Sequence, residues 1–425
     1  MAGGKLKTIN KKKNINNYNK HEKYFIGTPE ITFFKKVYKK ISQINIKLIE
    51  QTILGSYNFG NTLNCILNKS GHLLKNIYLE IILPDLNKPS HLKWYGYTNN
   101  IGCSIIKSIT FKINDQIIEK LYGEWIDIYY KINNINIDNI IKQYNSEYSI
   151  RNIHNNIDYK HRHIYIPIPF FFSKDSGTAL PLIALNHSIM SINIELRHLH
   201  EIIKVDNINE LNNISIKTNE KLICKLFSEI IFLDEIEQKL FINKNLEYLI
   251  EQTQFNENEF LNKNDLYKNI ALEFKFLIKQ LIWVIVIDSN NLDNILNNDH
   301  NNITKYTTKY SNYSDTFDSL KILFNNNEII NEHAEFYRNI QSNLYYKHIP
   351  SKYIYSYSFS INPLLYQPSG YINFSNIDDI MFSFKFNDFS LKQSGSATNG
   401  IIKIFATNYN ILKIVSGIGS LLYTI

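Results

Sequence analysis

The sequence contains few cysteines and no long apolar run, and both absences restrict its class. The 3 cysteines, Cys65, Cys103 and Cys224, are too widely spaced for a CxxC pair or a disulfide framework, so we expect a reducing compartment. The most apolar run, residues 281–287, is far shorter than the roughly 20 residues of a membrane-spanning helix. The first residues are polar and lysine-rich, unlike a secretory signal. We therefore expect a soluble protein made in a cytoplasm.

Motifs of common catalytic and nucleotide-binding sites are also missing, since the chain has no GxSxG, P-loop or HExxH sequence. Two HxH pairs, His161 with His163 and His198 with His200, could each place two imidazoles on one strand face. His163, however, is followed by the mainly apolar run 164–168, not by the carboxylate that completes such a metal site. We interpret these histidines as loop or solvent-facing residues. We predict no catalytic residue, no metal and no cofactor, and hence a protein that is not an enzyme.

The composition is that of a large globular protein rich in β-strands. Apolar residues make up 44% and aromatic residues 13% of the chain, with 29 Tyr and 25 Phe, which suits sheet surfaces better than helix bundles. Lys and Arg number 46 against 39 Asp and Glu, a net charge of +7, which only weakly favours an anionic partner. The lysine run 11–13 lacks interleaved aromatic residues and arginines, so we predict no specific nucleic-acid partner.

Short apolar runs separated by polar, Gly or Pro residues predict strands in both halves of the chain. In the first half these are 77–83, 105–113, 164–170 and 189–196; in the second half they are 223–233, 248–254, 281–287, 320–324, 353–361, 380–386, 401–407 and 409–415. Two prolines in 164–170 predict an edge or bulged strand. Helices are expected only at 123–131 and at 234–241, where Asp234 is placed to cap. The absence of a parallel βαβ rhythm favours an all-β fold of two tandem eight-stranded antiparallel jelly rolls with a few short helices in loops.

Polar stretches set the expected domain boundaries. Residues 1–25 predict a flexible, basic N-terminal arm, and residues 26–205 the first jelly roll. The polar stretch 206–220 is interpreted as the linker to a second jelly roll at 221–425. A further long polar tract, 288–316, is expected to be a protruding surface loop of the second roll.

Several stretches resemble the major capsid proteins of nucleocytoplasmic large DNA viruses, and they follow the order of that family. The matching stretches are Gly27–Tyr38, Tyr122–Trp125, Tyr165–Phe172, Ala179–Leu185, Phe232–Asp234, Glu247–Gln252, Leu281–Val284, Tyr357–Phe359, Gln367–Gly370, Asn373–Ser375 and Ile404–Asn410. The resemblance implies a double jelly roll that forms homotrimeric, pseudo-hexagonal capsomers tiling the icosahedral shell of a large double-stranded DNA virus. It also implies a place in the virion, assembly in the host cytoplasm, and minor capsid proteins as partners besides the chain itself. An internal viral membrane is a further candidate partner.

The resemblance also selects candidate positions for trimer contacts or packing: Ile31, Phe33, Phe34, Tyr38, Trp125 and Trp283. Among the Asn-x-Ser/Thr sequons, Asn302 and Asn312 lie in the expected surface loop and are the candidate glycosylation sites. Two other functions remain open. One is a poxvirus-type double jelly-roll scaffold protein that forms a transient lattice on immature membranes. The other is a jelly-roll carbohydrate-binding protein, in which aromatic residues of 306–313 would stack on sugars.

Overall fold

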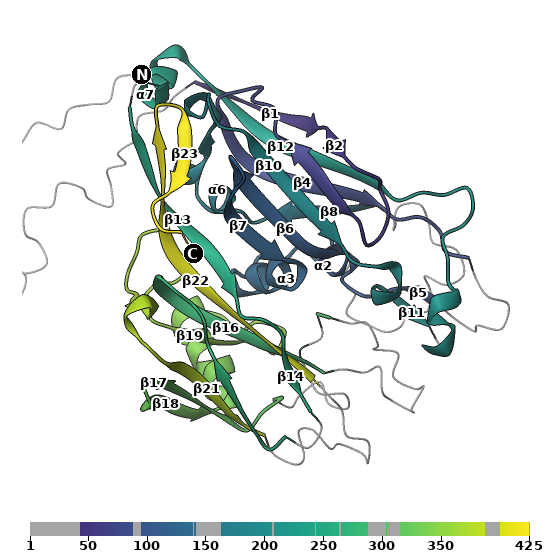
Figure 1. The fold of residues 1–425 in the computed structure, drawn as a ribbon, viewed down its shortest axis with the longest axis vertical. Coiled ribbons are helices and arrows are strands. Elements are labelled where there is room, and N and C mark those ends of the chain that lie inside the picture. Colours follow the sequence, from purple (N-terminus) through teal and green to yellow (C-terminus); the bar gives the residue numbers. More distant parts are fainter. Residues whose placement is uncertain are drawn as a thin grey trace, which may run out of the picture. The chain divides into compact units, whose positions relative to one another are not determined.

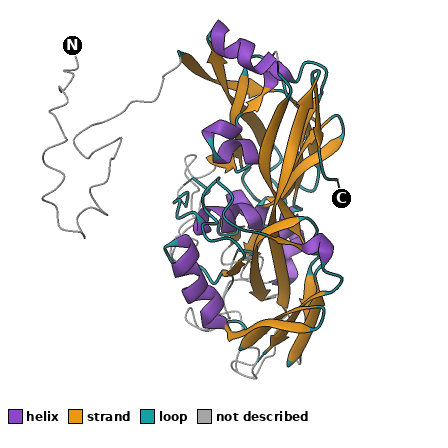
Figure 2. Ribbon diagram, turned by 90° about the vertical axis from the view of Figure 1, so that its left-hand side faces the viewer, coloured by secondary structure: helices purple, strands orange, loops and turns teal. Residues whose placement is uncertain are grey.

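The computed structural model describes one compact unit that begins at Ile44. The described residues are 43–87, 95–138, 140–141, 163–205, 208–242, 244–262, 265–287, 303–304, 306, 315–386 and 400–424. The predicted arm at 1–25, its continuation to residue 42 and most of the predicted loop at 288–316 lie outside the described residues. Strands form the body of the described unit, with helices at their margins (Figures 1 and 2).

The first half of the chain forms two antiparallel sheets. One has the strand order β1-β12-β4-β8, and the other has the order β2-β3-β10-β6-β7. Their bounds are β1 (Ile44–Gln51), β2 (Ile53–Leu54), β3 (Thr62–Ile66), β4 (Leu73–Ile82), β6 (Ile106–Ile113), β7 (Gln116–Tyr122), β8 (His163–Ile168), β10 (Met190–Leu196) and β12 (Ile223–Leu233). The short strand β9 (Leu180–Pro181) pairs with β4, and β5 (Tyr95–Tyr97) pairs with β11 (Ile203–Val205).

The second half repeats this arrangement. Its sheets have the orders β13-β22-β16-β19 and β15-β21-β17-β18. Their bounds are β13 (Leu246–Phe255), β15 (Tyr267–Ala271), β16 (Leu277–Ile287), β17 (Ser319–Phe324), β18 (Asn327–His333), β19 (Tyr355–Ser358), β21 (Ile380–Lys385) and β22 (Gly400–Val415). Three short strands add to the first of these sheets: β14 (Glu259–Leu261) and β23 (Ile418–Leu421) pair with β22, and β20 (Ile372–Asn373) pairs with β16.

The two halves share one topology. If the eight main strands of each half are numbered in chain order, both halves have one sheet ordered 1-8-3-6 and one ordered 2-7-4-5. Consecutive strands therefore alternate between two sheets, except for the fourth and fifth, which form a hairpin in one sheet, and the last strand returns beside the first. This is the jelly-roll arrangement of two packed antiparallel sheets. The predicted fold of two tandem eight-stranded jelly rolls is confirmed, and the halves are called roll 1 and roll 2 below.

The predicted boundary between the rolls is wrong. Residues 223–233, assigned to the second roll, form β12, which is paired with β1 and β4 along its length and is the last strand of roll 1. The polar stretch 206–220 is an excursion within roll 1, since Leu86 pairs with Ile216 in an isolated bridge. The rolls are joined instead at helix α7 (Glu235–Ile242). Polarity misled the prediction because a loop within a roll needs polar residues as much as a linker does.

Alternation of buried and exposed residues explains most of the strands. In β10 the side chains of Ile192, Ile194 and Leu196 are buried and their neighbours are half-buried, as the period of two predicts. The proline-containing strand β8 lies at the edge of its sheet, as predicted, because proline cannot donate a hydrogen bond to a second neighbour. The apolar run in β16 is buried from Leu281 to Ile285, on both faces of its sheet.

Helices are short and lie between strands. Both predicted helices are present, as α3 (Gly123–Ile132) and α7, and the Asp234 side chain accepts a hydrogen bond from the Glu237 amide, 2.8 Å away, as an N-cap. The other helical segments are α2 (Ile101–Ser104), α6 (Phe171–Lys174), η2 (Ser176–Thr178), η3 (Leu182–Ala184), η4 (Leu199–Glu201), η5 (Ile208–Asn213), η6 (Phe336–Ile340), η7 (Ser342–Tyr346) and η8 (Phe374–Asn376). In the described part of the chain, no helix combines the length and apolar character needed to cross a membrane.

Candidate functional site: the interface between the rolls

The two rolls meet where the free edge of one sheet of roll 1 faces the free edge of one sheet of roll 2. Strand β7 is the last strand of its sheet, β13 is the first of its own, and the Gln252 side chain on β13 donates a hydrogen bond to the Ile118 carbonyl on β7. Helix α3 follows β7 directly and packs against the outer face of the roll 2 sheet. We call this contact the inter-roll interface.

Glycine at position 123 allows α3 to start immediately after β7. A Cβ atom at Gly123 would lie 2.1 Å from the Cys103 carbonyl oxygen and 2.4 Å from that of Ile106. Both atoms belong to the backbone of roll 1, so neither can move aside like a side chain. The close approach aims the following residue pair, Glu124 and Trp125, at roll 2.

Aromatic side chains from both rolls form the apolar centre of the inter-roll interface. The rings of Trp125 and Phe405 are 5.2 Å apart, and those of Tyr122 and Phe255 are 4.7 Å apart. Phe255 also stacks on Phe405, with ring centroids separated by 4.8 Å. Such pairs contribute about 0.5–1.5 kcal/mol beyond the burial of their area. These four rings therefore hold β7 and α3 against β13 and β22.

A buried carboxylate on α3 binds one cation from each roll. The Glu124 Oε1 atom accepts a hydrogen bond of 2.8 Å from the Arg197 guanidinium of roll 1 and another from the Lys403 ammonium of roll 2. Burial opposes ionisation of Glu124, but Arg197 and Lys403 outweigh it and lower the pKa of this carboxyl to about 2. Glu124 is therefore ionised, and it links β10 to β22 through α3.

One turn later on α3, a second buried acid repeats this arrangement. The Asp127 Oδ2 atom lies 2.7 Å from the Lys352 ammonium of roll 2 and accepts a 3.1 Å hydrogen bond from the Tyr306 hydroxyl. Asn100 of roll 1 donates to the other carboxylate oxygen, at 3.0 Å. Tyr306 opens the segment predicted to stack on sugars, but its ring is buried and its hydroxyl is engaged. That residue is not available as a stacking platform.

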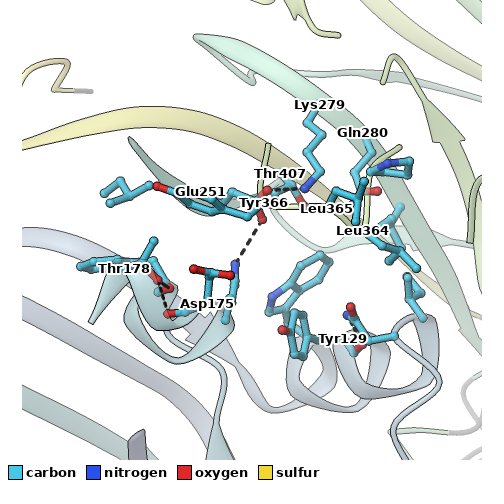
Figure 3. A pocket seen from close by; sticks show the side chains of 18 residues that line it. Tyr129, Asp175, Thr178, Glu251, Lys279, Gln280, Leu364, Leu365, Tyr366 and Thr407 are labelled. Carbon is cyan, nitrogen blue, oxygen red and sulfur yellow. Dashed lines mark hydrogen bonds and ion pairs between the residues drawn. The ribbon is translucent and has the colours of Figure 1, made fainter. Parts of the chain in front are cut away.

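A third cluster lies beside the helix and alternates acids with lysines. Lys174 of α6 lies 3.9 Å from Glu119 and 3.7 Å from Glu251, and Lys279 contacts Glu251 from strand β16, on the other side of β22. Glu119 also accepts a 2.8 Å hydrogen bond from the Phe171 amide. Burial raises the pKa of Glu119 to about 7, although Lys174 and the amide act against this rise. Figure 3 shows Glu251 and Lys279 on the sheet of roll 2, facing Tyr129 and Asp175 of roll 1.

Two hollows accompany the inter-roll interface. A cavity of about 240 Å³ lies between α3 and the roll 2 sheet, and Trp125, Tyr129 and Gln280 are among its lining residues. A groove of about 810 Å³ follows the facing edges of β7 and β13. Among the described residues, no group of three or more His, Cys, Asp or Glu side chains could hold a metal ion. The arrangement of packed rings and paired charges fixes the position of one roll on the other.

Of the positions predicted for trimer contacts, packing or glycosylation, the structure describes only Trp125 and Trp283, and it places them in different environments. Trp125 lies at the centre of the inter-roll interface, and Trp283 lies in the core of roll 2, where its ring meets Tyr337 at 5.2 Å and Phe382 at 5.1 Å. Both are buried, so their role is packing within one chain rather than contact with another chain. The remaining candidates lie outside the described residues: Ile31, Phe33, Phe34, Tyr38, Asn302 and Asn312.

The histidine pairs make no metal site that the structure describes. His198 and His200 stack on each other, with ring centroids 5.5 Å apart. His163 on β8 lies 3.4 Å from Glu80 on the adjacent strand β4, and His161 lies outside the described residues. The interface charges, by contrast, were missed. One signal in the sequence could have revealed them. Glu124 and Asp127 lie three residues apart in the otherwise largely apolar helix 123–132, where acids are unexpected.

Comparison with known proteins identifies the family to which the two rolls belong. Residues 32–234 match the family described as the N-terminus of the major capsid protein, and residues 237–420 match the large eukaryotic DNA virus major capsid protein. The two matches meet at α7, the junction seen in the structure. The chain belongs to the major capsid proteins of large eukaryotic DNA viruses.

Relatives of this capsid protein match it from end to end. The major capsid protein of Pyramimonas orientalis virus is 27% identical over 451 aligned residues, and that of Paramecium bursaria Chlorella virus 1 is 27% identical over 457; each alignment covers all of both chains. A quasi-atomic structure of the capsid of the latter virus aligns with a TM-score of 0.72 and 25% identity, over 93% of this chain and all of the other. The Faustovirus major capsid protein, 10% identical, shares the fold with a TM-score of 0.68 over 91% of this chain and 93% of its own.

The family membership confirms the predicted function class. This capsid protein is a structural component of the virion of a large DNA virus, not an enzyme, and it acts by associating with further copies of itself in a capsid lattice.

Proposed function

We propose that three copies of this capsid protein form a trimer with a pseudo-hexagonal outline, and that trimers tile the faces of an icosahedral shell. The observation that carries the proposal is that the chain contains two rolls of the same strand order, joined by a buried and charge-paired interface. Two similar rolls in each of three chains make a ring of six, and hexagonal outlines fill a plane without gaps. Closed threefold symmetry leaves no unfilled contact inside the ring.

The paired charges support a fixed angle between the rolls. An apolar contact alone tolerates sliding, whereas Glu124 and Asp127 each require a lysine of roll 2 at one position. Both carboxylates are buried. Moving Lys352 away would leave the charge of Asp127 without a cation, which costs several kcal/mol, and moving Lys403 away would leave Glu124 with Arg197 alone. A rigid angle is what a six-roll ring demands, because each error in the angle is repeated at every roll.

The finer partners follow from the same proposal. Minor capsid proteins would bind the gaps between trimers, and assembly would take place in the host cytoplasm, on or near an internal viral membrane. The cysteines are consistent with this compartment: Cys65, Cys103 and Cys224 are buried and unpaired. Burial raises the pKa of Cys65 to about 11 and that of Cys224 to about 12, so both stay protonated and unreactive at neutral pH.

The test is the light-scattering mass of the purified chain after size exclusion, at low and high salt. One chain has a mass of 50.0 kDa, so a trimer is expected at about three times that mass. An apolar contact surface would keep the trimer intact as salt rises, since screening acts mainly on exposed charges. A folded monomer at both salt concentrations would contradict the proposal. Detection of the chain in immature particles but not in mature virions would favour the transient scaffold instead.

A further inference from the structure

Each roll carries a surface that is equivalent to one side of the inter-roll interface but is not covered by the other roll. Within the chain, β7 and α3 of roll 1 cover β13 and the outer face of its sheet. Because both rolls have the same strand order, the counterparts of β7 and α3 in roll 2 are β18 and the helical segments η6 and η7. The counterpart of β13 in roll 1 is β1. Whereas β7, α3 and β13 form the inter-roll interface, their described counterparts β18, η6, η7 and β1 take no part in it.

The helical segments of roll 2 present an apolar stripe to solvent. Trp125, Tyr129 and Asn133 follow the end of β7 at four-residue spacing and line the cavity against roll 2. Phe336, Ile340 and Leu344 follow the end of β18 at the same offsets and the same spacing. Residues four apart share one face of an α-helix, and they stay near one face in η6 and η7, which are π-helical with slightly more residues per turn. Ile340 and Leu344 are 50% and 63% exposed, although their counterparts in roll 1 lie against a second roll.

A matching apolar surface lies on roll 1. Ile44, Ile46 and Leu48 alternate along β1 and are 52%, 52% and 60% exposed. Directly paired residues point to the same side of a sheet, so the register continues this face across the neighbouring strands β12, β4 and β8. It adds Ile231, Phe227, Tyr78 and Tyr165 to the face, together with the acids Glu50, Glu229 and Glu80, so the face is apolar mainly along β1. The equivalent face of roll 2 carries Phe255 and Phe405 and is covered by α3.

The unpaired edges of β1 and β18 independently indicate the same two surfaces. Strand β1 is the outermost strand of its sheet, β18 is the outermost strand of its own, and nearly all residues of both are exposed. Unpaired and exposed edges readily associate with another chain unless something covers them. The edges of β7 and β13 cover each other within the chain. The edges of β1 and β18 have no such partner among the described elements of the same chain.

We propose that the surface formed by β18, η6 and η7 of one copy covers the surface formed by β1 and the outer face of its sheet on the next copy. This inference rests on the proposed trimer and names its contact. The contact between copies then repeats the contact between rolls, with Phe336, Ile340 and Leu344 in the place of the α3 stripe. It is head-to-tail, since each copy uses a different surface toward each neighbour. Such contacts form a closed ring when the repeated rotation divides the circle, and six equal roll-to-roll steps close at three copies.

The first test replaces one exposed residue on each surface. Ile46→Glu on β1 and Leu344→Glu on η7 should each leave the fold intact, because both side chains are exposed in the single chain. Each places a charge in an apolar contact and should raise the concentration at which the trimer dissociates by at least ~30-fold. The matched control is Ile66→Glu on β3, in the opposite sheet of roll 1, where the same residue type is 50% exposed. The control should remain a trimer.

The second test establishes which surfaces meet. One chain carries Ile46→Cys and a differently tagged chain carries Leu344→Cys, and the two are mixed during assembly and treated with a short bismaleimide linker. The native cysteines are buried and should not react in the folded chain. Cross-links are expected only between unlike chains, and each variant alone should give none. Links within one variant alone, or none in the mixture, would overturn the assignment.

The outcomes separate this inference from the proposed trimer. A monomeric wild-type chain would overturn both. A wild-type trimer that persists unchanged in both Ile46→Glu and Leu344→Glu would leave the trimer standing and overturn the surfaces assigned here. Loss of the trimer in the Ile66→Glu control as well would show that contact is not confined to these surfaces, and would also overturn the assignment.

Discussion

Replacement of Glu119 by glutamine should make the protein more stable at pH 8 while changing little at pH 5. Burial raises the pKa of Glu119 from 4.5 to about 7, so the folded state favours the protonated acid. A raised carboxyl pKa gives stability that is present below pH 4.5 and is lost as the pH rises through 7. For these two pKa values, the wild-type protein loses about 2–3 kcal/mol of unfolding free energy between pH 5 and pH 8 because of this one group. Glutamine does not titrate, and its side-chain oxygen can still accept from the Phe171 amide.

The assay is urea unfolding of wild type and Glu119→Gln at pH 5 and pH 8, at one protein concentration. The difference between the two proteins should grow with pH. Glu124→Gln, five residues along the chain, is the matched control. Arg197 and Lys403 overcome burial and hold the pKa of Glu124 near 2, so its contribution is complete above pH 4.5 and is lost only toward pH 2. Glu124→Gln should therefore destabilise equally at pH 5 and pH 8. Parallel pH profiles for wild type and Glu119→Gln would refute the reasoning about Glu119.

The same interface supports three more predictions, each measured by urea unfolding. Glu124→Gln should cost about 3–5 kcal/mol, because it leaves the buried Arg197 and the half-buried Lys403 without their anion; a cost below 1 kcal/mol would show that the pair is dispensable. Trp125→Ala should cost about 3–5 kcal/mol by opening a cavity against Phe405, and a near-neutral effect would mean that the rolls do not depend on this ring. Gly123→Ala should destabilise strongly, since its Cβ would meet backbone oxygens at 2.1 and 2.4 Å, whereas Gly177→Ala, whose nearest atom is a side-chain oxygen at 3.1 Å, should be tolerated. Equal effects of the two glycine substitutions would contradict the steric argument.

Local pattern was sufficient to predict the strands with a long alternating or unbroken apolar run, but it missed shorter half-buried strands such as β3 and β7. The alternation in β10 and the unbroken apolar run in β16 each identified a strand and its burial. Strand β18 was missed because its sequence, Asn327–His333, is polar and almost wholly exposed. An edge strand awaiting a partner carries no buried face, and hence no periodic signal.

Long-range pairing was beyond what pattern could supply. The runs 401–407 and 409–415 were predicted as two strands, yet they form the single strand β22. Asn408, which divides them, and Asn410 in the second run are buried, and both donate hydrogen bonds to Gln252 on β13. The misplacement of β12 has the same origin. A strand's roll is decided by its hydrogen-bond partners far away in sequence, and its own residues do not reveal them.

The interface charges show why a chain of two similar rolls is not simply two apolar surfaces pressed together. Replacing a buried ion pair by apolar residues of the same volume is often neutral or stabilising, so stability alone does not explain Glu124 with Lys403 or Asp127 with Lys352. Each pair does penalise every arrangement of the rolls except the one in which the lysine reaches its acid. Two such pairs, three residues apart on α3, act against both sliding and rotation of roll 2. The counterparts of Glu124 and Asp127 at the same offsets after β18 are Glu335, which is exposed, and Arg338, which pairs with Asp315 of its own roll at 2.7 Å. Neither is a buried charge that waits for a partner on another copy. The contact between copies must form after folding and must release misplaced copies. An apolar surface allows this, because separating it leaves no buried charge without its partner.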